Sequence, residues 1–303
     1  MAMTDTKNVL LAGASGVLGR HIADALTRSG YAVVGLGRGA DADVTADLMD
    51  RDQLLRAVDG LEIDTVVHAA TALREAPMRH KDMFATDDLR ILGTRNLMEA
   101  AKEVGARRVV AESMVFGYGY RDFGDHVVTE DDVFGAAADR GVARHVEAMR
   151  VKESMMLGTQ GIEGVALRFG LFYGPGGTEN IVDLLRNKKL PAVNDRGRVL
   201  PWVNLADAGE SVARAVEGGR AGEAYNIVDD VPMGFGAHVR EVAEVFGTPR
   251  PMQVPTLMMR PMSYAYRMVT ASMRVANAKA KDELGWEPRY PDAAEGLRAL
   301  AAS

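Results

Sequence analysis

The chain has 303 residues, 47% hydrophobic and 26% charged, with a formal net charge of −6. This composition is ordinary for a globular protein, and an acidic chain without a basic block is a poor nucleic-acid binder. The absence of cysteine excludes disulfides, thiolate metal sites and thiol nucleophiles. No run approaches the roughly 20 apolar residues of a membrane span, and the first residues lack the apolar core of a signal peptide. We therefore expect a cytoplasmic protein that binds neither membrane nor nucleic acid.

Strand and helix signals alternate along the first half of the chain. Apolar runs predict buried strands at 7–12, 31–38, 64–70, 107–113 and 164–169, with a weaker strand at 43–47. Helical spacing marks 17–29, 82–104 and 144–157, and a capping-box pattern from Asp50 to Gln53 opens a helix that runs to about residue 58. Such alternation implies right-handed crossovers and a parallel sheet covered on both faces.

The alternation stops near the glycine-rich segment 173–177. Beyond it, we predict helices at 180–187, 205–216 and 235–246 and a strand at 224–228. The sequence thus predicts an α/β protein. Residues 1–173 form a Rossmann-type doubly wound parallel sheet that binds a dinucleotide. Residues 174–303 form a smaller substrate-binding portion, whose strand and helix near 205–230 return to the core.

Three glycines after the first predicted strand form the strongest local motif. Gly13 permits a tight turn, Gly16 lets the backbone approach a pyrophosphate, and Gly19 lets the helix pack close to the strand. The spacing G-x-x-G-x-x-G is one residue longer than the usual dinucleotide fingerprint. The helix N-terminus favours an anion there, so Ser15, Val17 and Leu18 join the predicted cofactor site.

The end of the second predicted strand bears on which dinucleotide binds. An NAD site needs a carboxylate there for the ribose 2′-hydroxyl, but no acid precedes Asp41, and Arg38 stands where a 2′-phosphate lies. A charge-assisted contact of about 1.5–3 kcal/mol between Arg38 and that phosphate corresponds to a roughly 10- to 100-fold preference for NADP over NAD. We predict NADP as cofactor, with NAD as the second choice and a solvated surface arginine as the alternative interpretation of Arg38.

Several further segments, in this order, resemble an extended or atypical short-chain dehydrogenase/reductase of the NAD-dependent epimerase/dehydratase type. They are Asp47-Leu48, VVHAAT (66–71), ILGTRNLMEAA (91–101), LRFGLFYGPG (167–176), WVNLADA (202–208) and AKDELGWEPRY (280–290). The resemblance implies an NAD(P)H-dependent oxidoreductase. It adds Asp47, Leu48, Ala69, Ala70, Thr71 and Phe169 to the cofactor site.

The chain departs from the catalytic set of the family it resembles, which is a serine, a tyrosine and a lysine four residues after that tyrosine. Counted back from Tyr118-Gly119, the serine position falls on Met114, and Ser113 lies on the other face of the strand. No tyrosine occurs in the segment 143–154.

Two registers are possible for the catalytic helix. If Glu153 takes the place of the helix glutamate, His145 and Met149 replace the tyrosine and lysine. If Lys152 is the lysine, Ala148 takes the tyrosine position. Neither register restores the triad. Arg90 replaces the asparagine often found on the preceding helix.

Three substitutes for the missing proton donor remain open. His145 is the first, because a histidine side chain can donate or accept a proton near neutral pH. Tyr118 or Tyr120 offers a phenol in the loop after the fifth strand, or the substrate carries its own donor. Ser113 completes the candidate catalytic set. Each candidate also has a structural interpretation: His145 as an exposed helix histidine, Tyr118 as a tyrosine packed in the site wall, and Ser113 as an ordinary strand hydroxyl. We interpret Lys152 as a solvated lysine.

Methionine is frequent, at 17 residues, and six methionines cluster between 252 and 273. Flexible, polarisable side chains suit broad apolar or aromatic ligands, although they also fill cores. We predict a large hydrophobic ketone, such as an aromatic polyketide of secondary metabolism. The resemblance suggests an angucyclinone-type ketoreductase of antibiotic biosynthesis, a kind that lacks the usual triad. The predicted substrate-binding residues are Met114, Tyr118, Met149, Tyr173 and Met258.

Two other functions compete with a ketoreductase. One is a nucleotide-sugar epimerase or dehydratase, for which Arg260, Arg267 and Arg274 offer diphosphate contacts. The other is an inactive NADP-binding sensor. The six histidines show no paired metal-ligand spacing, so we expect no metal. Asp207 is expected to cap a helix, and the protein to be a monomer or homodimer.

Overall fold

A seven-stranded parallel sheet forms the centre of the protein in a computed structural model that describes residues 7–136 and 140–303. The strand order is β11-β7-β5-β4-β1-β2-β3. These strands are β1 (Asn8–Ala12), β2 (Ala32–Gly37), β3 (Val44–Thr45), β4 (Thr65–His68), β5 (Arg108–Met114), β7 (Glu163–Phe169) and β11 (Ala224–Ile227). The predicted doubly wound α/β fold is confirmed.

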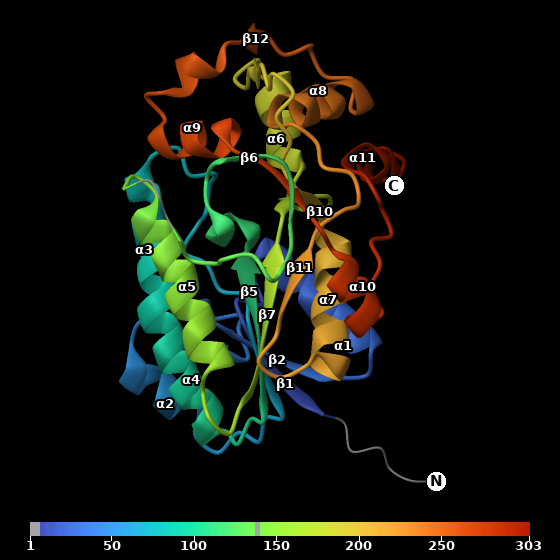
Figure 1. The fold of residues 1–303 in the computed structure, drawn as a ribbon. Coiled ribbons are helices and arrows are strands. Elements are labelled where there is room, and N and C mark those ends of the chain that lie inside the picture. The colour runs from blue at the N-terminus through green and yellow to red at the C-terminus, as the bar shows by residue number, and fades with distance from the viewer. Residues whose placement is uncertain (1–6, 137–139) are drawn as a thin grey trace.

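Helices cover both faces of the sheet (Figure 1). One face carries α2 (Arg51–Val58), α4 (Thr94–Glu103) and α5 (Ala143–Leu157), and the other carries α1 (Val17–Arg28), α7 (Leu205–Gly218) and α10 (Ala278–Leu284). Each face has its own apolar core: Val9 and Leu11 point to the side of α1 and α7, whereas Leu10 and Ala12 point to the side of α2 and α4. This alternation explains why the strands read as continuous apolar runs.

The long helix predicted at 82–104 is built from four pieces. It opens with a 3₁₀ turn, η1 (His80–Met83), and α3 (Phe84–Asp88), passes through a π-helical turn, η2 (Leu89–Gly93), and continues as α4. Single π turns inserted in helices are frequent at functional sites. The hydrophobic spacing alone gave no sign of this turn.

The remaining elements lie mostly above the carboxyl ends of the parallel strands (Figure 1). Three short two-stranded parallel sheets join distant segments: β8 with β10, β9 with β12, and β6 with β13. Their bounds and those of the accompanying helical elements are β6 (Asp122–Val128), β8 (Leu171–Tyr173), β9 (Ala192–Val193), β10 (Trp202–Asn204), β12 (Gln253–Val254), β13 (Ser272–Val275), η3 (Val115–Tyr118), η4 (Thr256–Met259), α6 (Glu179–Arg186), α8 (Phe235–Val245), α9 (Ser263–Thr270) and α11 (Ala293–Ala301).

Of the two predicted helix caps, the one at Asp50 is confirmed and the one at Asp207 is not. Asp50 accepts the predicted hydrogen bond from the backbone N–H of Gln53 at 3.0 Å. The prediction that Asp207 caps α7 is wrong. Asn204 holds the extended backbone before the helix and accepts from the N–H of Ala206 at 2.9 Å. Asp207 lies inside the first turn, and its carboxylate accepts instead from the backbone N–H of Tyr290.

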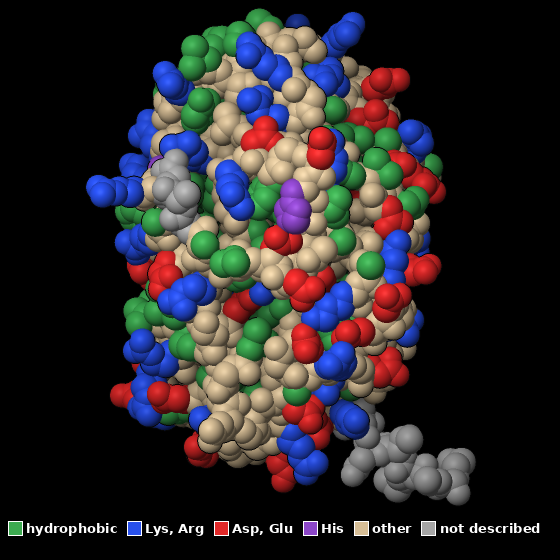
Figure 2. Space-filling model, viewed as in Figure 1, with side chains coloured by type: hydrophobic (Ala, Val, Ile, Leu, Met, Phe, Trp, Pro, Cys, Tyr) green, Lys and Arg blue, Asp and Glu red, His purple; other side chains and the backbone are tan. Residues whose placement is uncertain are grey.

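Acidic and basic side chains are mixed over the face shown in Figure 2. Among the described residues, none of the helices has the length and apolar character needed to cross a membrane.

Candidate active site

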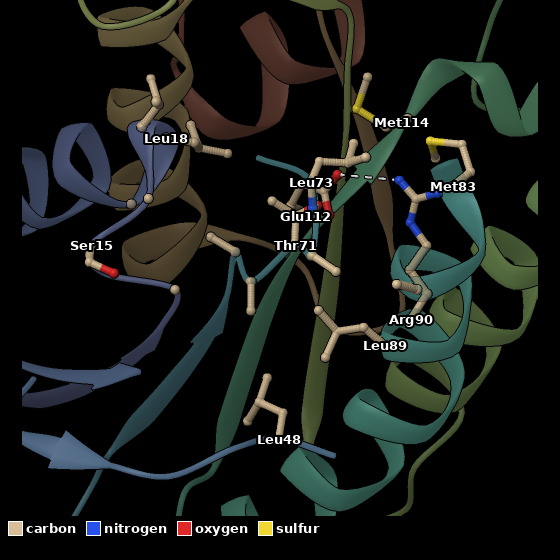
Figure 3. A pocket seen from close by; sticks show the side chains of 18 of the residues that line it. Ser15, Leu18, Leu48, Thr71, Leu73, Met83, Leu89, Arg90, Glu112 and Met114 are labelled. Atoms are coloured by element: carbon tan, nitrogen blue, oxygen red, sulfur yellow. Dashed lines mark hydrogen bonds and ion pairs between the residues drawn. The ribbon is translucent and has the colours of Figure 1, made fainter. Parts of the chain in front are cut away.

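A cavity of about 810 Å³ opens at the carboxyl ends of β1, β2, β4 and β5. The glycine-rich turn after β1 forms one side, and η2 with the end of β5 forms the other (Figure 3). The wall on that second side is mainly apolar, with five charged or phenolic groups among the residues. This part of the lining includes Leu73, Met83, Asp88, Leu89, Arg90, Glu112, Met114, Phe116, Tyr120, Leu171 and Tyr264.

The glycine-rich turn has the shape that a phosphate group needs. Gly13 has a φ of 93°, and a Cβ there would lie 2.8 Å from the backbone of Ala70. A Cβ on Gly19 would lie 2.0 Å from the carbonyl oxygen of Gly13, so both positions require glycine. Gly16 occupies the N-cap of α1 and lines the cavity. The free N–H groups of a helix N-terminus therefore face a space able to hold an anion.

Of the predicted cofactor residues, only Phe169 lies away from the cavity. It is fully buried in the core on the side of α1 and α7, because the side chains at the end of β7 turn into that core. The residues that line the cavity are Gly13, Ser15, Gly16, Val17, Leu18, Gly19, Arg38, Asp47, Leu48, Ala69, Ala70 and Thr71.

Arg38 is exposed at the cavity, one residue beyond β2. The carboxylate of Asp43 turns back and accepts a hydrogen bond from the N–H of Gly35 at 2.7 Å. Along the chain from Arg38, the first acidic residue in the lining is Asp47, whose Oδ1 accepts from the N–H of Met49. Arg38 is thus the first charged residue after β2 that lines the cavity.

Two predicted catalytic residues belong to a buried network outside the cavity lining. Oγ of Ser113 donates to Glu153 at 2.5 Å, and Glu153 pairs with Arg168, whose Nη2 lies 2.8 Å from Oε2. The hydroxyl of Tyr118 donates to Asn226 at 2.9 Å and accepts from Arg168 at 2.7 Å. Burial, opposed by Arg168, raises the pKa of Tyr118 to about 12.

His145, the third predicted catalytic residue, is fully buried and lies outside the cavity lining. Its Nδ1 lies 2.6 Å from Oδ2 of Asp87, and its Nε2 lies 3.0 Å from Nδ1 of His80. The alternative of an exposed helix histidine is wrong, because α3 and η1 pack over this side of α5.

Among the predicted substrate residues, Met114 lines the cavity. Met149 is buried in the cluster around Val115 and Val146, and Tyr173 is buried against α8 and α11. Met258 is 62% exposed on η4 and lies outside the lining. The methionine cluster between 252 and 273 therefore does not surround the cavity as a group.

The interpretation of Lys152 as a solvated lysine is also wrong. Its side chain is 1% exposed, and its Nζ donates to Oε2 of Glu112 at 3.0 Å. Glu112 lies two residues before Met114 on β5 and so shares its face of the strand, opposite Ser113. The sequence signal that could have revealed this ion pair is the carboxylate of Glu112 within the otherwise mainly apolar strand β5.

The charges around Glu112 determine its ionisation. Burial alone would raise the pKa of the Glu112 carboxyl, but Lys152, Arg90 and the hydrogen bond from Lys152 hold it below its usual value. Burial also lowers the pKa of Lys152, although the adjacent carboxylate opposes this shift. An ion pair therefore lies behind the cavity wall, with Glu112 in the lining and Lys152 buried beneath it.

Tyr120 and Tyr264 place two phenols in the same wall. Their hydroxyl oxygens lie 3.0 Å apart, and both side chains are 8% exposed. Burial raises the pKa of both phenols, and the charge of Arg90 opposes the rise. One hydroxyl donates to the other, so the proton of the acceptor hydroxyl remains available to a ligand. Across residues 7–136 and 140–303, no cluster of three or more metal-ligating acids and histidines occurs.

Comparison with known proteins gives one family. Residues 9–228 match the model of the NAD dependent epimerase/dehydratase family. The chain is 33% identical over 306 residues to a 3-diazoavenalumate denitrifying reductase from a Streptomyces species, with 95% of this chain and 98% of the relative covered. It is 22% identical to a putative UDP-glucose 4-epimerase from Methanocaldococcus jannaschii, with 96% of each chain covered.

Solved structures share the fold. The human epimerase family protein SDR39U1, crystallised with NADPH, superposes with a TM-score of 0.82 at 17% identity, covering 98% of this chain and 99% of that one. UDP-glucose 4-epimerase from Thermotoga maritima, crystallised with UDP-glucose, gives 0.78 at 20% identity and covers 97% of each chain.

Proposed function

Because this chain belongs to the NAD-dependent epimerase/dehydratase family, we propose that it is an NADPH-dependent reductase acting on a large hydrophobic, aromatic substrate. The observation that carries this proposal is the continuity of the cavity, which extends from the glycine-rich turn and Arg38 to an apolar chamber. A ketone of a polyketide-like molecule is the hydride acceptor that we propose first.

The residues present fit a dinucleotide. The N-terminus of α1 would hold the pyrophosphate, and Arg38 would bind a 2′-phosphate in preference to a bare ribose, with NAD as the weaker ligand. Such a cofactor supplies hydride, and the protein supplies binding, orientation and charge. NADPH in the human relative supports this choice.

For a ketone, the Tyr120–Tyr264 pair is the proton donor that we propose. A hydroxyl that accepts from its neighbour is a stronger donor, and both phenols border the cavity. Tyr118, Ser113 and His145 lie outside the lining and form hydrogen bonds with other buried side chains, so they would stabilise the fold rather than contact the substrate.

A second candidate acceptor is an aryl diazonium ion. No tyrosine–lysine pair faces the cavity in the described chain, and hydride addition to a cation needs no proton donor. The balanced reaction is ArN₂⁺ + NADPH → ArH + N₂ + NADP⁺. The relative that is 33% identical is named as a denitrifying reductase of a diazo compound.

A substrate panel tests these proposals. Purified protein is mixed with NADPH and, in turn, with naphthoquinone-type ketones and a naphthalene diazonium salt, and in a separate sample with NAD⁺ or NADP⁺ and UDP-glucose, while absorbance at the NADPH band and gas release are followed. NADPH consumption with a ketone supports the first acceptor, and consumption with stoichiometric nitrogen supports the second. Sugar conversion without net NADPH consumption indicates an epimerase. Tight NADPH binding without any turnover indicates a sensor and contradicts the reductase.

A further inference from the structure

Arg90 is a buried cation in the cavity wall, placed there by the π-helical turn η2. It is 7% exposed and lines the cavity. Figure 3 shows its guanidinium turned toward Glu112 beside Met83 and Met114. A guanidinium removed from water needs several hydrogen bonds or a close carboxylate to offset its lost hydration.

The protein does not supply such a partner among the described residues. The ion pairs of Arg90 join Nη1 to Oδ1 of Asp87 at 3.8 Å and Nη2 to Oε1 of Glu112 at 3.9 Å. Both distances exceed those of N–H···O hydrogen bonds, about 2.7–3.2 Å. The buried Nη1 has no hydrogen-bond partner in the part of the chain that the structure describes.

Both carboxylates near Arg90 have closer partners. Oδ2 of Asp87 lies 2.6 Å from Nδ1 of His145, whereas Oδ1, which faces Arg90, has no hydrogen-bond partner among the described residues. Glu112 accepts from Lys152 at 3.0 Å. Lys152 therefore compensates most of the charge on Glu112. The guanidinium of Arg90 is left with the two long ion pairs, and Arg90 lines the cavity.

We propose that Arg90 binds the carboxylate of an aromatic acid, so that the substrate of this enzyme has a flat apolar body with an anionic end. A planar guanidinium matches a carboxylate through two parallel hydrogen bonds. The tyrosine pair adds a neutral donor in the same wall, and Leu73, Met83 and Phe116 provide apolar contact for a ring. The proposal rests on the proposed reductase, whose substrate class it narrows.

Calorimetry with two matched probes tests the proposal without turnover. 2-Naphthoate and 2-naphthamide have nearly the same shape and differ in charge. We expect the wild-type protein to bind the naphthoate at least about tenfold more tightly, as a charge-assisted contact predicts. Arg90→Gln removes this preference. Arg186→Gln is the control, because Arg186 is an exposed arginine of α6 that pairs with Asp183 and lies outside the cavity lining, so the preference is retained.

Equal affinities in the wild-type protein, or an unchanged preference in Arg90→Gln, would overturn the proposal. If Arg90→Gln fails to fold, a crystal structure of the wild-type protein with 2-naphthoate decides: a carboxylate beyond hydrogen-bond distance of Arg90 contradicts the assignment. NADP⁺ is titrated in the same instrument. Naphthoate preference without NADP⁺ binding supports this inference and refutes the reductase, whereas NADP⁺ binding without the preference refutes only this inference.

Discussion

Nζ of Lys152 donates a hydrogen bond of 3.0 Å to Oε2 of Glu112, behind a cavity wall that is otherwise mainly apolar. The lysine comes from α5 and the glutamate from β5, 40 residues apart in the chain. Neither side chain would be tolerated there alone, because an unpaired buried charge is more costly than a buried pair.

The first prediction concerns this pair. Lys152→Met leaves the Glu112 carboxylate without its closest cation and lowers the free energy of unfolding by about 3–5 kcal/mol. The double variant Lys152→Met/Glu112→Gln recovers a large part of this loss, because no uncompensated charge remains. Urea unfolding of the wild type, both single variants and the double variant measures the coupling, and strictly additive losses contradict it.

The second prediction concerns cofactor choice. Arg38→Ala raises KM for NADPH and leaves that for NADH nearly unchanged, which shrinks the NADPH preference by about 10- to 100-fold. Steady-state kinetics with both cofactors measures the ratio. Arg20→Ala is the control, because Nη1 of Arg20 binds the carbonyl oxygen of Ser15 and the residue lies outside the cavity lining. A ratio that does not change in Arg38→Ala excludes 2′-phosphate recognition by this arginine.

The third prediction separates the tyrosines. For a ketone substrate, Tyr264→Phe lowers kcat about 100-fold, the range of a positioned acid, with little change in KM for NADPH. Tyr118→Phe keeps kcat within about twofold but destabilises the fold, because Arg168 and Asn226 lose a buried partner. For a diazonium substrate, both variants keep the wild-type rate. A rate loss in Tyr118→Phe that exceeds that in Tyr264→Phe would show the assignment to be wrong.

The fourth prediction uses pH. His238 stacks on Trp202 with ring centroids 3.8 Å apart, and burial lowers its pKa from 6.5 to about 3. The unfolded chain therefore binds a proton that the native protein does not bind between these values, so stability falls as pH drops from 6.5 toward 3. His238→Phe keeps the stacking and removes this contribution. Urea midpoints from pH 7 to 4 should decline less steeply in the variant, and parallel declines contradict the prediction.

The local features of the Rossmann half could be predicted from sequence. Short apolar runs, glycine stops and the triplet Gly13, Gly16 and Gly19 encode their structure within a few neighbouring residues. Segments whose role depends on a distant partner could not. The sequence predicted Asp207 as the cap of α7, but Asn204 caps the helix in the structure. The carboxylate of Asp207 accepts a hydrogen bond from the backbone N–H of Tyr290, a residue that is remote in the sequence.

The candidate site shows the same division. Ser113, Tyr118 and His145 have the right chemistry for catalysis, but each is bound by a residue from another element: Glu153, Asn226 and Asp87. Arg90 was recognised only as a replacement, since helical periodicity cannot reveal a π turn or the distance to Asp87.

The amino-acid sequence alone determined the order of the main strands and helices in the first half of the chain, the glycine-rich turn and the loss of the tyrosine–lysine pair, because these depend on residue type and short spacing. Only the tertiary structure decided which polar side chains face the cavity. A strand or helix face becomes a site wall or a core according to what packs against it, and for Glu112, Lys152 and Tyr264 those neighbours come from remote parts of the chain.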